Sequence, residues 1–227
     1  MEGSGTGTGS GSERFRRAAK ATALDDAVLP ESRPVVPVGG ATLLADSAVG
    51  AEQRILLGTD ATVVRFLEGC FDEPIRTASL SQVSTPPLPT DAELELTGDE
   101  TVLRRETLLR GSRSGRNYVY AEAAVVLDRV APAVREGLLS TSEAIGHLLI
   151  ANRVESFREL VSVGRMPAGP LADRFGLDSS DELLSRTYRI VMGGRPALLI
   201  SEYFPPRFNV EAQDRHLEGD SAIENGS

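Results

Sequence analysis

The sequence predicts an α+β protein in which helices flank an antiparallel β-sheet. Two pairs of apolar, strand-like runs are each joined by a turn-forming segment, G-S-R-S-G-R in the first pair and Gly193–Gly194 in the second. Strands joined by short turns are antiparallel neighbours, and such a sheet commonly buries one face under other elements. Segments with helical spacing lie between the strand-like runs, so the sheet is expected to carry helices on one side.

Composition limits the classes of partner. The chain has 227 residues, 41% of them hydrophobic, which suits one main domain. The formal net charge of −9 argues against DNA or RNA, because phosphate binding requires a basic surface. Neither a membrane span nor a signal peptide is recognisable in the sequence. We therefore expect a cytoplasmic monomer that binds a small molecule and no membrane.

Residues that bind transition metals are scarce. Cys70 is the only cysteine, and the two histidines, His147 and His216, lie far apart in the sequence. A disulfide within the chain is excluded, and a histidine-based metal site is disfavoured. We expect no metal and no cofactor. Lys20 is the only lysine, so an anion site would use arginine.

The ends of the chain lack the apolar periodicity of a folded core. Residues 1–49 are expected to form a flexible Gly/Ser-rich tail and a Pro-containing linker, with a short helix at 13–24. Residues 211–227 are expected to form an acidic disordered tail. The folded domain is then expected over residues 50–210.

The first elements of this domain are a short segment and a helix. A polar turn at 59–62 offers Asp60 as an N-cap, apolar residues recur at helical spacing from Val63 to Leu67, and Gly69 is suited to end the helix. Residues 74–83 then form a plausible strand before a proline-rich connection.

The remaining elements are two hairpins and a helix between them. The first hairpin is expected from residues 102–110 and 117–127, and the second from residues 186–192 and 195–204. Between the hairpins, Ser140 and Glu143 match a capping box, so a helix is expected from there to about Val163.

Two charged residues fall on apolar strand faces. Alternation places Glu202 on the face of Leu198, Ile200 and Phe204. It also places Arg105, rather than Arg104, on the face of Leu103, Thr107 and Leu109. Buried charges need partners. These two residues form a structural ion pair, or they lie at strand ends and reach solvent, or they hold opposite ends of a small polar anion in a closed pocket.

Gly146 interrupts a helical pattern, where glycine costs about 1 kcal/mol relative to alanine. Either it allows close helix packing, or the helix begins near it. In the second case, backbone N–H groups around Ile145 and in the turn before Val63 would face a ligand. For Glu122 and Arg158 we expect a solvated or salt-bridged position, with Arg158 on the helix that ends near Val163.

An ordered series of motifs resembles the chorismate lyase family, including its less characterised bacterial and archaeal branch. The motifs span residues 51–206, and they are L-L-G-T-D-A-T-V-V-R-F-L-E, R-E-T-L-L, N-Y-V-Y-A-E-A-A-V-V, A-I-G-H-L-L, R-T-Y-R-I and I-S-E-Y-F-P. The resemblance implies an α+β fold with an antiparallel sheet and an enclosed cavity. It also implies conversion of chorismate to 4-hydroxybenzoate and pyruvate without a cofactor.

The resemblance also implies roles for particular residues. Arg105 matches the arginine that binds the ring carboxylate, and Glu202 matches the carboxylate at the ring hydroxyl. Ile145 matches the residue whose backbone N–H meets the ring carboxylate, next to Gly146, and Val63 matches the residue of the earlier turn. Arg105 and Glu202 are thus expected to be catalytic, and the substrate site is expected to consist of Arg105, Ile145, Val63, Gly146 and Glu202.

The sequence departs from the family pattern at Ala144, where lyases often have proline, and at Glu122, where some have arginine. Glu122 would alter the charge of the cavity. Arg158 and Arg186 are candidates for further cationic residues. Two other functions stay open: a non-catalytic small-ligand-binding domain, related to the effector domains of bacterial regulators, and a lyase for a related substrate.

Overall fold

A computed structural model describes residues 48–59, 62–97 and 100–208, and the backbone of residues 36–37. Most of the two expected tails, the expected helix at 13–24 and the expected N-cap Asp60 lie outside these described residues.

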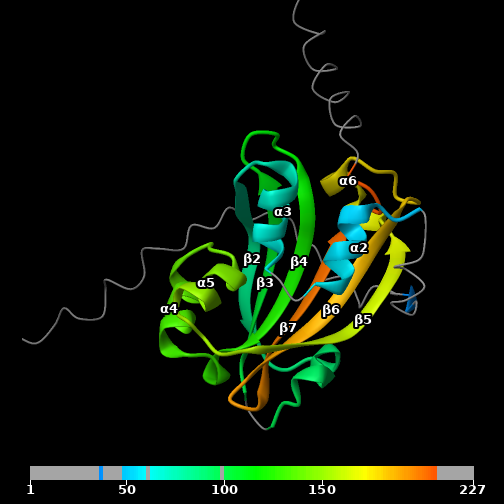
Figure 1. Ribbon diagram of the computed structural model, residues 1–227. Helices are drawn as coiled ribbons and strands as arrows, with labels where there is room; N and C mark the ends of the chain where they lie inside the picture. The colour runs from blue at the N-terminus through cyan, green and yellow to red at the C-terminus, as the bar shows by residue number, and fades with distance from the viewer. Residues whose placement is uncertain (1–35, 38–47, 60–61, 98–99, 209–227) are drawn as a thin grey trace, which may run out of the picture. The chain divides into compact units, whose positions relative to one another are not determined.

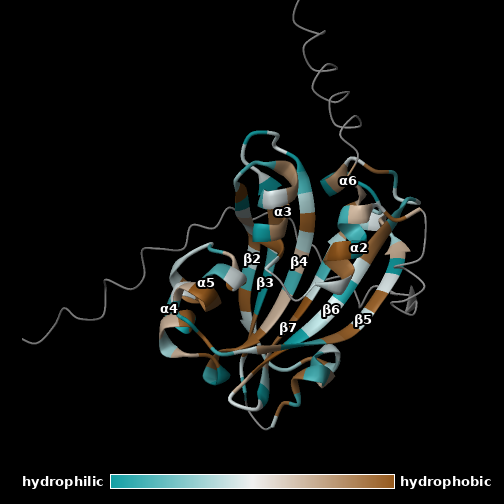
Figure 2. Cartoon of the chain, viewed as in Figure 1, coloured by the Kyte–Doolittle hydropathy of each residue, from teal (hydrophilic) through white to brown (hydrophobic). Residues whose placement is uncertain are grey.

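The described residues form one antiparallel sheet of seven strands in the order β1-β5-β6-β7-β4-β3-β2 (Figure 1). The strands are β1 (Val36–Pro37), β2 (Ile75–Thr85), β3 (Val102–Gly111), β4 (Asn117–Val126), β5 (Phe157–Pro167), β6 (Glu182–Met192) and β7 (Arg195–Phe204). Both expected hairpins are confirmed, as β3–β4 and β6–β7, and they meet where β4 pairs with β7. Hydrophobic residues run along these two central strands in Figure 2.

Helices and short 3-10 turns cover the sheet. They are α2 (Ala51–Gly58), α3 (Val63–Phe71), η1 (Pro89–Leu94), η2 (Leu127–Arg129), α4 (Pro132–Ser140), α5 (Ile145–Ala151), η3 (Gly169–Leu171) and α6 (Ala172–Phe175). Helices α2, α3 and α5 lie over one face, which we call the inner face (Figure 1). Leu67 of α3 packs there with Leu109 and Val119. On the opposite face, Phe175 of α6 packs with Tyr120 and Tyr203.

The expected helix from Ser140 to about Val163 is wrong. Ser140 ends α4, and α5 covers only Ile145–Ala151. Helix α5 stops at Asn152 and Arg153, where Arg153 adopts a left-handed conformation with φ of 50°. Residues 157–167 form β5 instead, because they pair along their length with β6. Pairing with a neighbouring strand outweighs the helical pattern of an isolated segment.

The α3 helix begins two residues later than an N-cap at Asp60 would place it, and it also ends later than expected. Its N-cap is Thr62, and it runs through Gly69 to Phe71. It ends at Asp72, which adopts a left-handed conformation with φ of 48°. Starting the helix at Val63 places its first N–H groups at the inner face of the sheet.

Candidate active site

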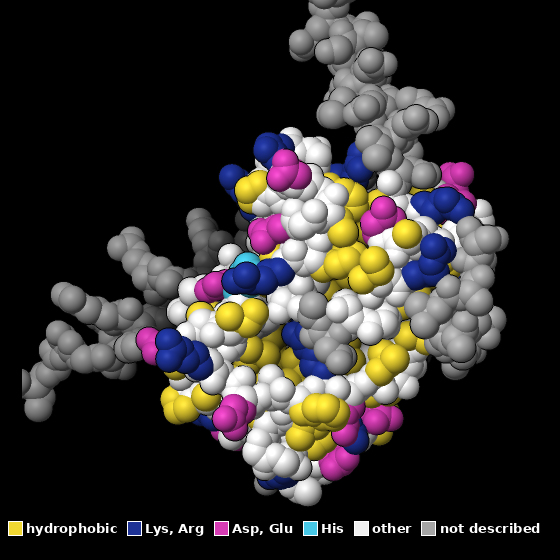
Figure 3. Space-filling model, viewed as in Figure 1, with side chains coloured by type: hydrophobic (Ala, Val, Ile, Leu, Met, Phe, Trp, Pro, Cys, Tyr) yellow, Lys and Arg dark blue, Asp and Glu magenta, His cyan; other side chains and the backbone are white. Residues whose placement is uncertain are grey.

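A cavity lies between the inner face of the sheet and the first turns of α3 and α5. The space between its lining atoms, part of it open to solvent, is about 620 Å³. The lining residues come from three sources, namely the α3 start (Thr62, Val63, Val64), the α5 start (Glu143, Ala144, Ile145, Gly146) and the sheet (Thr77, Arg105, Thr107, Leu109, Ala121, Ala123, Arg158, Tyr188, Ile190, Ile200, Glu202). In Figure 3, a hollow at the centre of this face shows hydrophobic side chains, with basic atoms at its edge.

Arg105 is a buried cation with unused hydrogen-bond donors. It is 2% exposed, and its Nη2 donates to the backbone oxygen of Glu143 at 3.2 Å. Its Nε and Nη1 have no hydrogen-bond partner among the described residues. Burial lowers the pKa of Arg105 from its ordinary value, and an unpaired buried charge of this kind is costly for the fold. The Arg105 side chain therefore has donors left to bind an anion.

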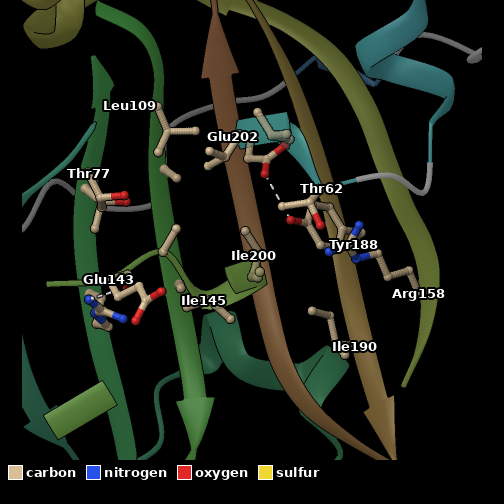
Figure 4. A pocket seen from close by; sticks show the side chains of 18 residues that line it. Thr62, Thr77, Leu109, Glu143, Ile145, Arg158, Tyr188, Ile190, Ile200 and Glu202 are labelled. Carbon is tan, nitrogen blue, oxygen red and sulfur yellow. Dashed lines mark hydrogen bonds between the residues drawn. The ribbon is translucent and has the colours of Figure 1, made fainter. Parts of the chain in front are cut away.

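Glu202 is also buried, at 5% exposure, but it is paired within the protein. Its Oε2 accepts a hydrogen bond from Arg186 Nε at 2.6 Å, and its Oε1 accepts one from the Tyr188 hydroxyl at 2.9 Å. Burial and the neighbouring Glu202 carboxylate raise the pKa of Tyr188, so this hydroxyl stays protonated and donates. Figure 4 shows Glu202 and Tyr188 on adjacent strands at the cavity wall.

Arg105 and Glu202 do not pair with each other, so the hypothesis of a structural ion pair between them is wrong. Arg105 lies on β3 and Glu202 on β7, with β4 between them. The backbones of β3 and β7 are therefore two strand spacings, or about 10 Å, apart. Between them β4 contributes only the small side chains of Ala121 and Ala123 to the lining. The cavity thus has a cation at one end, a carboxylate at the other and open space between them.

Gly146 brings the two helix starts together. A Cβ atom at this position would lie 2.6 Å from Thr62 Cγ2, so a larger residue would push α5 away from the start of α3. Both interpretations of Gly146 therefore hold, since α5 begins at Ile145 and packs closely there. Neither helix has a side-chain cap. The N–H groups of a first helical turn have no intrahelical acceptor, so those near Val63 and Ile145 can meet an anion in the cavity.

Arg158 and Glu122 are both half-buried, but the two side chains lie in different places on the sheet. Arg158 lies on β5 rather than on a helix, and it lines the cavity. Glu122 lies on the opposite face of the sheet from Ala121 and Ala123, where the hydroxyls of Tyr120 and Tyr203 donate to it at 3.2 and 3.4 Å. Glu122 is absent from the described lining of the cavity, so its departure from the family pattern does not change the charge there.

The sequence did not predict Tyr188, whose hydroxyl donates to Glu202, as a lining residue of the cavity, and it did not predict Glu202 as the partner of Arg186. Arg186, Tyr188 and Ile190 alternate along β6, which is a usable signal for a shared face. All five predicted substrate-site residues, by contrast, line the cavity, including Val63, Ile145 and Gly146.

Within the described parts of the chain, no group of three or more His, Cys, Asp or Glu residues is placed to hold a metal ion. Over the same residues, no helix is both long and apolar enough to cross a membrane.

Known proteins resemble this chain in sequence and in fold. The sequence model of a family described as "Chorismate pyruvate-lyase Rv2949c-like" matches residues 56–211. A chorismate pyruvate-lyase of Mycobacterium leprae is 34% identical over 153 residues, which cover 66% of this chain and 72% of that protein. A chorismate pyruvate-lyase of Mycobacterium tuberculosis is 30% identical over 156 residues, which cover 66% and 78%.

Among solved structures, PhnF from Mycobacterium smegmatis matches with a TM-score of 0.52 and 9% identity, over 65% of each chain, and this likeness supports the fold alone. The family match covers most of the described domain, including Arg105, Ile145 and Glu202. The chain therefore belongs to the Rv2949c-like chorismate pyruvate-lyase family.

Proposed function

We propose that the protein is a lyase that eliminates pyruvate from chorismate and leaves 4-hydroxybenzoate. One observation carries this proposal, namely the buried Arg105 whose Nε and Nη1 lack partners among the described residues at the cavity wall. A ring carboxylate would accept a hydrogen bond from one of these donors and would neutralise the charge. The likeness to chorismate pyruvate-lyases of two mycobacteria supports this choice of ligand.

The cavity suits a ring with polar groups at opposite ends. Arg105, together with first-turn N–H groups near Ile145 and Val63, binds the ring carboxylate. Glu202 accepts a hydrogen bond from the ring hydroxyl, which is para to that carboxylate. Ala121 and Ala123 leave room for the ring between these two ends. The bound ring is thereby fixed in one orientation, and such positioning lowers the barrier to the elimination.

These residues can provide every group that the reaction needs. The bond between the ring carbon and the ether oxygen breaks, and the adjacent carbon that bears the hydroxyl loses its hydrogen. That proton ends on the methylene carbon of the departing enolpyruvyl group, which gives pyruvate, and the ring becomes aromatic. Both Glu202 oxygens already accept hydrogen bonds from Arg186 and Tyr188. This pairing favours a role for Glu202 in orienting the ring hydroxyl. The ring proton would then pass directly to the departing enolpyruvyl group.

Incubation of the purified protein with chorismate tests the proposal. We expect 4-hydroxybenzoate and pyruvate in equal amounts by chromatography, with the same rate after treatment with EDTA. If EDTA abolished turnover and one metal ion restored it, the reaction would depend on a metal cofactor, which would contradict the proposal. Binding of 4-hydroxybenzoate without any turnover would instead indicate a ligand-binding domain. We also propose that residues 50–210 hold the complete site, so a chain trimmed to residues 34–210, which keeps β1, should retain the full rate.

A further inference from the structure

The substrate of the proposed function, on which this inference rests, carries a second carboxylate that Arg105 does not bind. The ring carboxylate binds to Arg105, whose Nε and Nη1 lack partners among the described residues. The carboxylate of the enolpyruvyl side chain then needs its own partner in the cavity, because a desolvated anion without one is costly. Only two cations occur among the described lining residues, Arg105 and Arg158.

Arg158 stands beside the Glu202 end of the cavity. Its guanidinium carbon is 5.5 Å from the centroid of the Tyr188 ring, whose hydroxyl donates to Glu202. Figure 4 shows the Arg158 side chain extending from β5 toward Tyr188. In the sheet, β5 and β6 lie on the far side of β7 from β3. Arg158 therefore approaches the ligand from the side opposite to Arg105.

Arg186 is the other arginine near Glu202, but its donors serve the protein. Its Nε binds Glu202, and its Nη1 donates to the backbone oxygens of Leu56 and Thr59. The Glu202 carboxylate also neutralises its charge. Arg186 is absent from the lining of the cavity, whereas Arg158 lines both this cavity and a neighbouring surface cleft. Arg158 is thus the cation placed at the mouth of the site.

We propose that Arg158 binds the enolpyruvyl carboxylate of the substrate and selects for dicarboxylates. The ether oxygen is attached to the ring carbon next to the one that bears the hydroxyl. A ring held between Arg105 and Glu202 can therefore direct this side chain past Glu202 toward β6 and β5. This carboxylate leaves the site as part of pyruvate, so the product 4-hydroxybenzoate has no contact with Arg158. Arg158 acts on substrate binding and Arg105 on both substrate and product.

Arg158→Gln and Arg105→Gln separate these roles, with Arg153→Gln as a matched control. Arg153 lines the surface cleft but not the cavity, so its replacement changes the net charge equally. We expect Arg158→Gln to raise the KM for chorismate about 10- to 100-fold, as for loss of one partly desolvated charge contact. The Kd of 4-hydroxybenzoate should stay within about twofold. Arg105→Gln should weaken binding of both ligands, and Arg153→Gln should change neither.

Calorimetry with unreactive ligands keeps this test independent of turnover. The probes are 3-(carboxymethoxy)benzoate, which has two carboxylates, and 3-methoxybenzoate, which has one. In the wild-type protein the dicarboxylate should bind at least about tenfold more tightly, and Arg158→Gln should abolish that preference. Arg158→Lys, which keeps the charge, should restore part of it.

Two results would overturn the role of Arg158. One is equal affinity of the wild-type protein for both probes, which needs no variant to fold. The other is an equal loss of affinity for both probes in Arg158→Gln, because Arg158 would then act by packing against Tyr188. A preference for the dicarboxylate that depends on Arg158, without any conversion of chorismate, would uphold the Arg158 site and reject the lyase activity.

Discussion

Arg105 and Arg186 are two guanidinium groups on the inner face of one sheet, with exposures of 2% and 3%. Arg186 is satisfied by the Glu202 carboxylate and by backbone oxygens of α2 and of the turn after it. Arg105 has one backbone oxygen as a partner and two unused donors. Arg105 and Arg186 are thus equally buried but have different roles. Arg186 holds the Glu202 side chain and the α2 end in place, whereas Arg105 is available to a ligand.

The largest expected effect is the loss of stability on replacing the paired arginine. Arg186→Met removes the cation opposite Glu202 and leaves that carboxylate buried beside Tyr188 alone. Breaking a buried pair in this way costs about 3–5 kcal/mol of unfolding free energy. Urea unfolding at neutral pH measures it. A loss below about 1 kcal/mol would show that Arg186 does not support the fold.

Arg105→Met is the matched substitution at the unpaired arginine. Because it removes a buried charge that has no ion-pair partner among the described residues, stability should be unchanged or about 1–2 kcal/mol higher. The free energy of 4-hydroxybenzoate binding should become less favourable by about 2–5 kcal/mol. Urea unfolding and calorimetric titration measure the two quantities. If Arg105→Met destabilised the fold as much as Arg186→Met, the contrast between the two arginines would collapse.

Glu73 sharpens the comparison as a buried charge that the protein satisfies fully. Burial opposes its ionisation, but hydrogen bonds from the Ser114 and Tyr118 hydroxyls and from the N–H groups of Ser114 and Arg113 lower the pKa of Glu73 to about 2. Since its folded pKa lies below the unfolded value, its contribution is present above about pH 4.5 and is lost as the pH falls toward 2.

This contribution amounts to about 2–3 kcal/mol. Glu73→Gln should therefore lower the unfolding free energy at pH 7, and the difference from the wild-type protein should shrink as the pH falls from 4.5 toward 2. Denaturant unfolding at pH 7, 5 and 3 provides the test. A difference independent of pH would mean that Glu73 acts by shape rather than by charge.

The smallest effect is expected at Glu122, on the face of the sheet away from both arginines. Glu122→Gln keeps an acceptor for the hydroxyls of Tyr120 and Tyr203 and removes only the charge. The free energy of 4-hydroxybenzoate binding should change by less than about 0.5 kcal/mol. Calorimetric titration measures this change. A change in binding free energy as large as that of Arg105→Met would indicate that Glu122 does contribute to the ligand site.

Alternation along strands was sufficient to find Arg105 and Glu202, because each lies within a regular stretch of strand. The same rule could not find the partner of Glu202. Counting from the Gly193–Gly194 turn places Arg186 opposite Ser201, but Ala197 is an extra residue in β7 that shifts the register. Arg186 then faces Glu202. A bulge of one residue exchanges the faces of a strand, and the local sequence gives little sign of it.

The segment from Phe157 to Val163 shows a second limit of the sequence. Its residues suit either a helix or a strand, and pairing with β6 decides between them. The position of Arg158 at the cavity follows only from that pairing. The start of α3 was predictable to within two residues from the polar turn before Val63, whereas a start of α5 near Ile145 was only one of the two alternatives that Gly146 left open.

A crystal structure of the complex with 4-hydroxybenzoate tests most directly whether Arg105 is the residue kept for a ligand carboxylate. We expect a carboxylate oxygen to accept a hydrogen bond from Arg105 Nε or from Arg105 Nη1 at about 2.7–2.9 Å. The ring hydroxyl should lie at Glu202, with the pair between Glu202 and Arg186 intact. A ligand bound with its hydroxyl at Arg105, or bound elsewhere while Nε and Nη1 stay without an acceptor, would contradict the account.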